Sequence, residues 1–266
     1  MEKLNINPDP RLEPAPERTG FDYGVSVAKA GTIVFPFLGA GVTLFDLITT
    51  PLRTKRLSDW LEQLRLRINE LSQKVATLTP VRLAEDEAFN TAFFQAAQAV
   101  LRTHQKEKLD ALRNAVLNVA LGKEANADRQ TQFLALVERF TAAHLTLLQF
   151  FQDPAGHFER RKIPVPSVSI GTNLLAYELV RAALPELHQQ LQSTGKERTA
   201  SVFQMFQVLF DDLTSTKLIA LQRIKDGEAW IVPRFTTQPT PYPVNSVITH
   251  LGEDFLAFIS ESCGAA

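Results

Sequence analysis

An apolar seam in residues 57–78 constrains the fold of this chain more than any other feature. Its members follow one another in steps of four and three residues: Leu57, Leu61, Leu64, Ile68, Leu71, Val75 and Leu78. This spacing places all of them on one side of an α-helix. The seam is short for a free coiled coil, so we expect this helix to pack inside a helical bundle.

Other segments repeat their apolar residues with the same helical spacing. Residues 84–103 begin with acidic side chains, which stabilise a helix N-terminus. Residues 106–122 end at Gly122, and glycine is common just after the last residue of a helix. Residues 128–153 predict one further helix that closes before Pro154. Residues 30–153 therefore predict four or five helices joined by short links.

The composition changes after the stretch "HFERRKIPVPS", where charges and two prolines predict a boundary near residues 155–167. Two helical segments follow, then two short β-type runs, "TKLIALQR" and "EAWIVPRF", around the turn "KDG". A last helical segment contains the pattern Thr249, Leu251, Gly252, Phe255 and Leu256.

In this order of elements and in that final pattern, residues 168–262 resemble a winged-helix domain. The whole chain is also similar to uncharacterised bacterial helical proteins, a likeness that implies no activity. The expected fold is mainly α, with an N-terminal helical bundle and a C-terminal winged-helix-like α+β module. We expect a flexible proline-rich tail at 1–24, a helical domain at 25–158 with an apolar segment at 30–52, and a winged-helix-like domain at 159–263.

The winged-helix resemblance would make residues 199–213 a recognition helix for DNA. This segment contains no lysine or arginine and ends in Asp211 and Asp212. From residue 165 onward, seven basic residues face ten acidic ones, whereas DNA binding needs cations near the phosphates. We therefore expect no nucleic-acid partner. A protein partner or a second copy of the chain is the expected ligand of this module.

The most apolar part of the chain, residues 30–52, allows two interpretations. Residues 30–45 form an uncharged run of 16, shorter than the roughly 20 residues that a membrane-spanning helix needs. Pro36 favours a short helix at 37–50 that is buried in the protein. Alternatively, the segment enters a membrane and the basic helix at 53–82, with a formal charge of +4, lies at the head groups. The candidate contacts are then Phe37, Leu38, Leu44, Phe45, Arg53, Lys55, Arg56, Arg65 and Arg67.

The sequence contains few candidates for chemistry. It has no phosphate-binding loop, zinc-binding helix or nucleophile elbow, and we expect no metal and no cofactor. The stretch "RFTAAH", Arg139 to His144, resembles the motif of small helical ribonucleases of the HEPN class, in which an arginine and a histidine act on a phosphodiester. That motif allows four to six residues between the arginine and the histidine, so Arg181 and His188, with six residues between them, also fit it. Phe140 stands where a polar residue is usual, which weakens the resemblance.

Three hypotheses for function follow. The leading one is a non-enzymatic bacterial interaction or regulatory protein that acts through protein–protein contacts. The alternative is a membrane-associated effector that uses the apolar segment 30–52 and the basic helix 53–82. The third is a helical ribonuclease that uses Arg139 and His144. A polar, proline-rich start and a single cysteine, Cys263, favour a cytoplasmic location, and the membrane alternative implies the inner membrane.

Overall fold

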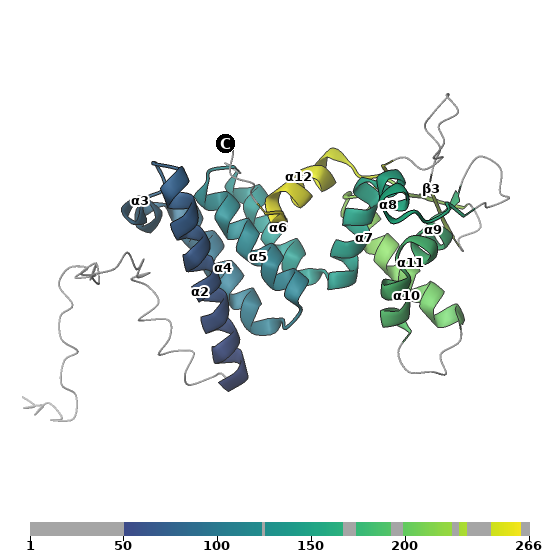
Figure 1. Ribbon diagram of the computed structural model, residues 1–266, viewed down its shortest axis with the longest axis horizontal. Helices are drawn as coiled ribbons and strands as arrows, with labels where there is room; N and C mark the ends of the chain where they lie inside the picture. Colours follow the sequence, from purple (N-terminus) through teal and green to yellow (C-terminus); the bar gives the residue numbers. More distant parts are fainter. Residues whose placement is uncertain are drawn as a thin grey trace, which may run out of the picture. The chain divides into compact units, whose positions relative to one another are not determined.

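The computed structural model describes residues 51–123, 126–166, 174–192, 199–224, 229–232 and 246–261 (Figure 1). The predicted tail at 1–24 and residues 30–50 of the apolar segment lie outside these described residues. Residues 48–266 form one compact unit, and its described part is mainly helical.

A helical bundle forms the first part of the described chain, as the apolar spacing predicts. Its helices are α2 (Pro51–Lys74), α3 (Pro80–Glu85), α4 (Glu87–Arg102), α5 (Lys106–Ala120) and α6 (Ala127–Arg139). Helix α4 contacts α2, α5 and α6, and these four helices lie side by side (Figure 1). Several links are closed by side-chain caps. For example, the carboxylate of Asp86 accepts a hydrogen bond from the amide of Phe89 and begins α4.

The seam faces the bundle, and a helix over the seam from Leu57 to Leu71 is confirmed, whereas α2 ends at Lys74 and Val75 and Leu78 lie in the turn that follows. Leu57, Leu64, Ile68, Leu71 and Leu78 are buried, and Leu61 and Val75 are half-buried. The helix packs on α4 and α5. Trp60, which lies outside the seam, is also buried, and its indole Nε1 donates a hydrogen bond to the carbonyl of Leu109 at 3.0 Å. That bond ties the beginning of α2 to the beginning of α5.

The second part of the described chain combines short helices with a small antiparallel sheet. Its helices are α7 (Ala142–Gln152), α8 (Pro154–Arg161), α9 (Ala176–Ala183), α10 (Pro185–Leu191) and α11 (Thr199–Ser215). Its strands are β1 (Leu174–Leu175), β2 (Gln222–Arg223) and β3 (Trp230–Val232). The strand order is β1-β3-β2, with Leu174 opposite Val232 and Arg223 opposite Trp230.

The last described helix, α12 (His250–Ile259), packs on α5 and α7. Thr249 caps it by accepting from the amide of Gly252, and its hydroxyl donates to the carbonyl of Lys217. A side chain at Gly252 would collide with the backbone at Leu218, so this position needs a glycine. The winged-helix interpretation of residues 168–262 is not confirmed, because the helix assigned to the end of that module packs on the bundle. The domain boundary predicted near residue 158 stays a prediction.

Candidate functional site

The predicted helix at 128–153 is interrupted, and a polar cluster around the buried side chain of His144 forms at the interruption. Helix α6 ends at Arg139 and α7 begins at Ala142, with extended backbone at Phe140 and Thr141. The expectation of one continuous helix was wrong. The side chain of His144 turns back over this break, where its Nδ1 accepts a hydrogen bond from the amide of Thr141 at 3.1 Å. Its ring stacks on Phe140 with centroids 4.8 Å apart.

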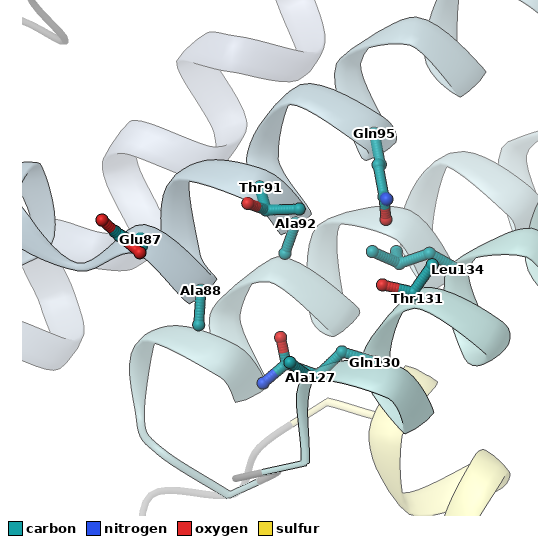
Figure 2. A pocket seen from close by; sticks show the side chains of 9 residues that line it. All are labelled: Glu87, Ala88, Thr91, Ala92, Gln95, Ala127, Gln130, Thr131 and Leu134. Carbon is teal, nitrogen blue, oxygen red and sulfur yellow. The ribbon is translucent and has the colours of Figure 1, made fainter.

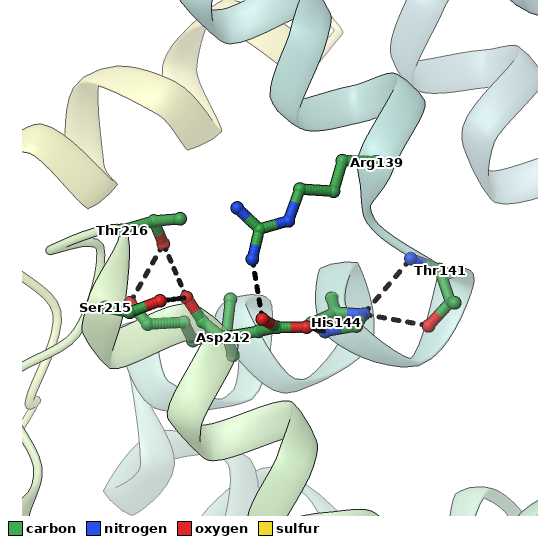
Figure 3. Close-up of polar contacts among 7 residues, drawn as sticks. Arg139, Thr141, His144, Asp212, Ser215 and Thr216 are labelled. Carbon is green, nitrogen blue, oxygen red and sulfur yellow. Dashed lines mark hydrogen bonds and ion pairs between the residues drawn. The ribbon is translucent and has the colours of Figure 1, made fainter.

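The same histidine and the predicted Arg139 both contact Asp212, a residue of α11 (Figure 3). Arg139 Nη2 lies 2.6 Å from one carboxylate oxygen, and His144 Nε2 lies 3.3 Å from the other. Because an amide can only donate, Nδ1 of His144 is the acceptor and Nε2 carries the proton toward Asp212. The sequence pairs Arg139 with His144 correctly in space, but it gives no sign of Asp212, which is 68 residues further along the chain than His144.

Burial decides the protonation of His144, whose side chain is 6% exposed. Burial lowers the pKa of His144 below its usual value, and the hydrogen bond and charge of Asp212 act in the opposite direction. The positive charges of Arg139 and Lys108 lower this pKa further. The imidazole is therefore neutral at neutral pH, and it donates to Asp212 as a neutral group.

This arrangement leaves His144 without a nitrogen for substrate. A general base must reach the proton that it removes, and here one nitrogen faces the amide of Thr141 and the other faces Asp212. Arg139 is half-exposed, but its guanidinium is paired with the same carboxylate. The cluster joins the α6–α7 break to α11, and its chemistry is that of a structural contact.

Ion pairing distinguishes the cations of the predicted basic helix. In the middle of α2 they are paired: Arg65 binds Glu62 through two hydrogen bonds, and Arg67 binds Glu70 and Glu261. Lys74, the last residue of α2, is exposed and forms no ion pair with a described residue. The proximity of Glu62 and Arg65 on one helix face was expected from their spacing. These two arginines of the predicted basic patch are thus largely neutralised.

The first two turns of α2 differ from the rest of the helix. Arg53, Lys55 and Arg56 form no ion pair with any residue in the part of the chain that the structure describes. Leu52, beside them, is 75% exposed. The first turn contains no acidic residue, so three cations stand near the positive end of the helix dipole. We call Leu52, Arg53, Lys55 and Arg56 the basic end of α2. The other candidate lipid contacts, Phe37, Leu38, Leu44 and Phe45, lie outside the described residues.

A pocket of about 330 Å³ opens beside the basic end of α2. Its walls come from α2, the α4–α5 link and the first turn of α5. The lining includes Leu52, Lys55, Arg56, Trp60, His104 and Leu109. A second pocket, of about 320 Å³, lies between α4 and α6 (Figure 2). Small side chains such as Ala88, Ala92 and Ala127 create it, and Glu87 is its one ionisable residue. We assign no chemistry to this second pocket.

Helix α11, the predicted recognition helix, exposes Met205 and Val208 and directs its acidic end to internal contacts. Asp212 binds Arg139 and His144, and Asp211 binds Arg223. Helix α11 contains no lysine or arginine that could attract phosphate.

Two searches of the described residues found nothing: none of their helices is both long and apolar enough to cross a bilayer, and no cluster of three or more histidine, cysteine, aspartate or glutamate residues could hold a metal ion. Residues 30–50 were outside both searches. Comparisons with protein-family models, with curated proteins and with solved structures found no match. Function is therefore argued below from the geometry of this chain alone.

Proposed function

We propose that this protein is a non-enzymatic helical protein that associates with an anionic membrane surface. In this proposal the apolar segment 30–52 enters the lipid, and the basic end of α2 lies among the head groups. The distribution of ion pairs along α2 carries the proposal. Arg65 and Arg67 in the middle of α2 are paired, whereas Arg53, Lys55 and Arg56 cluster without an ion pair to a described residue where the apolar segment joins the helix. Lys74, at the other end of α2, is a single exposed cation.

Of these three cations, Arg53 lies in the first turn of α2, and Lys55 and Arg56 lie in the second. A cation in the first turn of a helix opposes the helix dipole, at a cost of about 0.3–1 kcal/mol. Near an anionic surface such a cation becomes favourable, because each lysine or arginine there contributes about 1 kcal/mol of binding free energy. Three cations and a stretch of apolar residues provide the two signals that stable membrane anchoring requires. The three cations form no ion pair within the described part of the bundle.

Flotation with lipid vesicles tests this proposal. We expect the wild-type protein to float with vesicles of phosphatidylcholine and phosphatidylglycerol at 3:1, and to float less with phosphatidylcholine alone. Leu44→Asp places a charge in the apolar segment and should reduce flotation. Leu66→Asp is the matched control, because Leu66 is an exposed leucine of α2 outside that segment. Absence of wild-type flotation with the anionic vesicles would refute the proposal.

A second candidate function, contact with another copy of the chain, is favoured by the uncharged face of α11. Met205 and Val208 are 47% and 54% exposed and lie one turn apart. Sedimentation velocity over a range of concentrations tests this candidate. We expect a dimer that Val208→Asp weakens, and a wild-type protein that is monomeric at every concentration would exclude it.

A further inference from the structure

The pocket beside the basic end of α2 has two walls that are fixed to each other. Trp60 is 2% exposed, and the bond from its indole Nε1 to the carbonyl of Leu109 joins α2 to α5. Leu109 also lines the pocket. The apolar base of the pocket is therefore held by the bundle core, and this base is pre-formed before any ligand arrives.

Nitrogen donors from two separate elements line the same pocket. Lys55 and Arg56 come from the second turn of α2, and His104 comes from the α4–α5 link. Asp59 and Gln63 also line the pocket, one turn and two turns further along α2. Asp59 forms no ion pair with Lys55 or Arg56 within the described structure. Two positive charges thus stay available to a ligand, and one carboxylate can accept from a ligand hydroxyl.

We propose that this pocket binds a phosphate ester, presented as the head group of an anionic phospholipid. Lys55, Arg56 and His104 supply donors to the phosphate oxygens, as charged donors commonly do for such groups. The volume of about 330 Å³ is at the lower end of the range of small-ligand pockets and suits a head group. Exposed Leu52 borders the pocket and is placed to contact the acyl chains. This inference rests on the proposed function, which it deepens by assigning the lipid a binding site.

RNA is the competing anionic ligand, and the pocket does not suit it. Surfaces that bind single-stranded nucleic acid combine cations with exposed aromatic rings on which the bases stack. The indole here belongs to Trp60, which is buried and already hydrogen-bonded. An apolar residue such as Leu52 beside the cations matches a lipid better than a nucleotide.

The first test compares two double variants that remove the same charge. Lys55→Gln with Arg56→Gln alters the pocket. Lys74→Gln with Lys123→Gln alters exposed cations at the opposite ends of α2 and α5. With vesicles of phosphatidylcholine and phosphatidylglycerol at 3:1, we expect the pocket variant to bind at least about 10-fold more weakly than the wild type, since each cation near the surface adds to binding. The control should change by less than about threefold. Equal losses in the two variants would overturn the inference.

The second test separates a pocket from a diffuse basic patch. His104→Ala removes a hydrogen-bond donor of the pocket but no lysine or arginine, so a diffuse patch of basic residues would not respond to it. We expect His104→Ala to weaken vesicle binding at pH 8, and His250→Ala, at a fully exposed histidine of α12, to leave it unchanged. Unchanged binding in His104→Ala would overturn the pocket while the proposed membrane association stands. Absence of wild-type binding to the vesicles would overturn both.

Soluble ligands identify the source of the phosphate. We expect millimolar sn-glycerol 3-phosphate to compete weakly with vesicles, because it shares the head group and lacks the acyl chains. Tighter binding of free glycerol phosphate than of vesicles would overturn the lipid assignment. Tighter binding of a single-stranded RNA oligonucleotide, lost in the Lys55→Gln and Arg56→Gln variant, would also overturn it in favour of RNA.

Discussion

Asn118 should be among the most sensitive polar positions of this protein, because it joins α5 to the end of α12. The side chain is 1% exposed. Its Nδ2 lies 2.8 Å from the carbonyl oxygen of Phe258, 3.0 Å from that of Ser260 and 3.3 Å from that of Ala257. These carbonyls end a helix and have no partner of their own within it. One side-chain amide therefore reaches three carbonyls at the C-terminus of α12.

The expected loss of stability in Asn118→Ala follows from the number of hydrogen bonds that Nδ2 can donate. An amide nitrogen carries two hydrogens, so two carbonyls lose a full donor in Asn118→Ala. An acceptor left buried and unpaired costs about 1–3 kcal/mol, so we expect Asn118→Ala to lower the free energy of unfolding by about 2–4 kcal/mol. Asn114→Ala is the comparison, because half-buried Asn114 makes one such bond, to the carbonyl of Ile259 at 3.0 Å. It should cost about 1 kcal/mol.

Urea unfolding followed by circular dichroism at 222 nm measures both variants. Asn118→Asp tests the direction of these hydrogen bonds, because it replaces the donating amide by a carboxylate that faces carbonyl oxygens. Its loss of stability should be largest near neutral pH and should shrink as the pH falls and the carboxyl group regains a proton to donate. The reasoning is refuted if Asn118→Ala lies within about 0.5 kcal/mol of wild type, or if Asn114→Ala costs more than Asn118→Ala.

Two further predictions concern positions that the structure explains. Gly252→Ala should destabilise the protein by about 2 kcal/mol or more in urea unfolding, because the added carbon would lie 2.2 Å from the carbonyl oxygen of Leu218; a gain in stability, which this change normally brings inside a helix, would contradict the close approach. For His144, burial lowers the pKa in the fold, so between that lowered pKa and about 6.5 the unfolded chain binds more protons than the folded protein. Wild-type stability should therefore fall as the pH drops below about 6.5, by at most about 1.4 kcal/mol per pH unit, and His144→Gln should lack this component. If the stability of wild type and of His144→Gln changed with pH in parallel, this contribution of His144 would be excluded.

The helices of this fold could be predicted wherever local spacing determines them. The seam from Leu57 to Leu71 is repetitive, and its burial follows from one helix lying on a bundle. The end of this helix at Lys74 was missed, because the apolar spacing continues to Leu78. Gly122 was expected to follow a helix, and it has the positive φ of 68° that this position needs. The break at Thr141 was missed because threonine and histidine are compatible with a helix interior, and the capping contact between them depends on a side-chain orientation.

The contacts between distant elements could not be read from the sequence. In the sequence, Asp212 is only one of two acidic residues that end a helical segment, whereas in the fold it accepts from Arg139 and His144. Helix α12 carries a pattern that resembles a winged helix, but its partners are Asn114 and Asn118 of α5. Local residue patterns indicate the type of element, and the pairing of elements depends on surfaces that form only after several helices have packed.

The candidate site also depends on contacts that the sequence does not reveal. Composition assigns a basic patch to residues 53–82, and it treats Arg65 and Arg67 like Arg53 and Lys55. The structure distinguishes them, because the later arginines bind acidic neighbours and the earlier cations do not. His104 joins them only through the fold, since it is some 50 residues away along the chain and lines the same pocket.

The most direct test of the central claim compares the environment at the beginning of α2 with that further along the same helix during lipid binding. Leu52→Cys and Leu66→Cys, each in a Cys263→Ser background, can be labelled with an environment-sensitive fluorophore, because both leucines are exposed. On addition of vesicles containing phosphatidylglycerol, we predict a blue-shifted and enhanced emission from the label at position 52 and little change at position 66. A shift at position 66 without one at position 52, or no shift at either position, would contradict the claim that the basic end of α2 lies at the membrane.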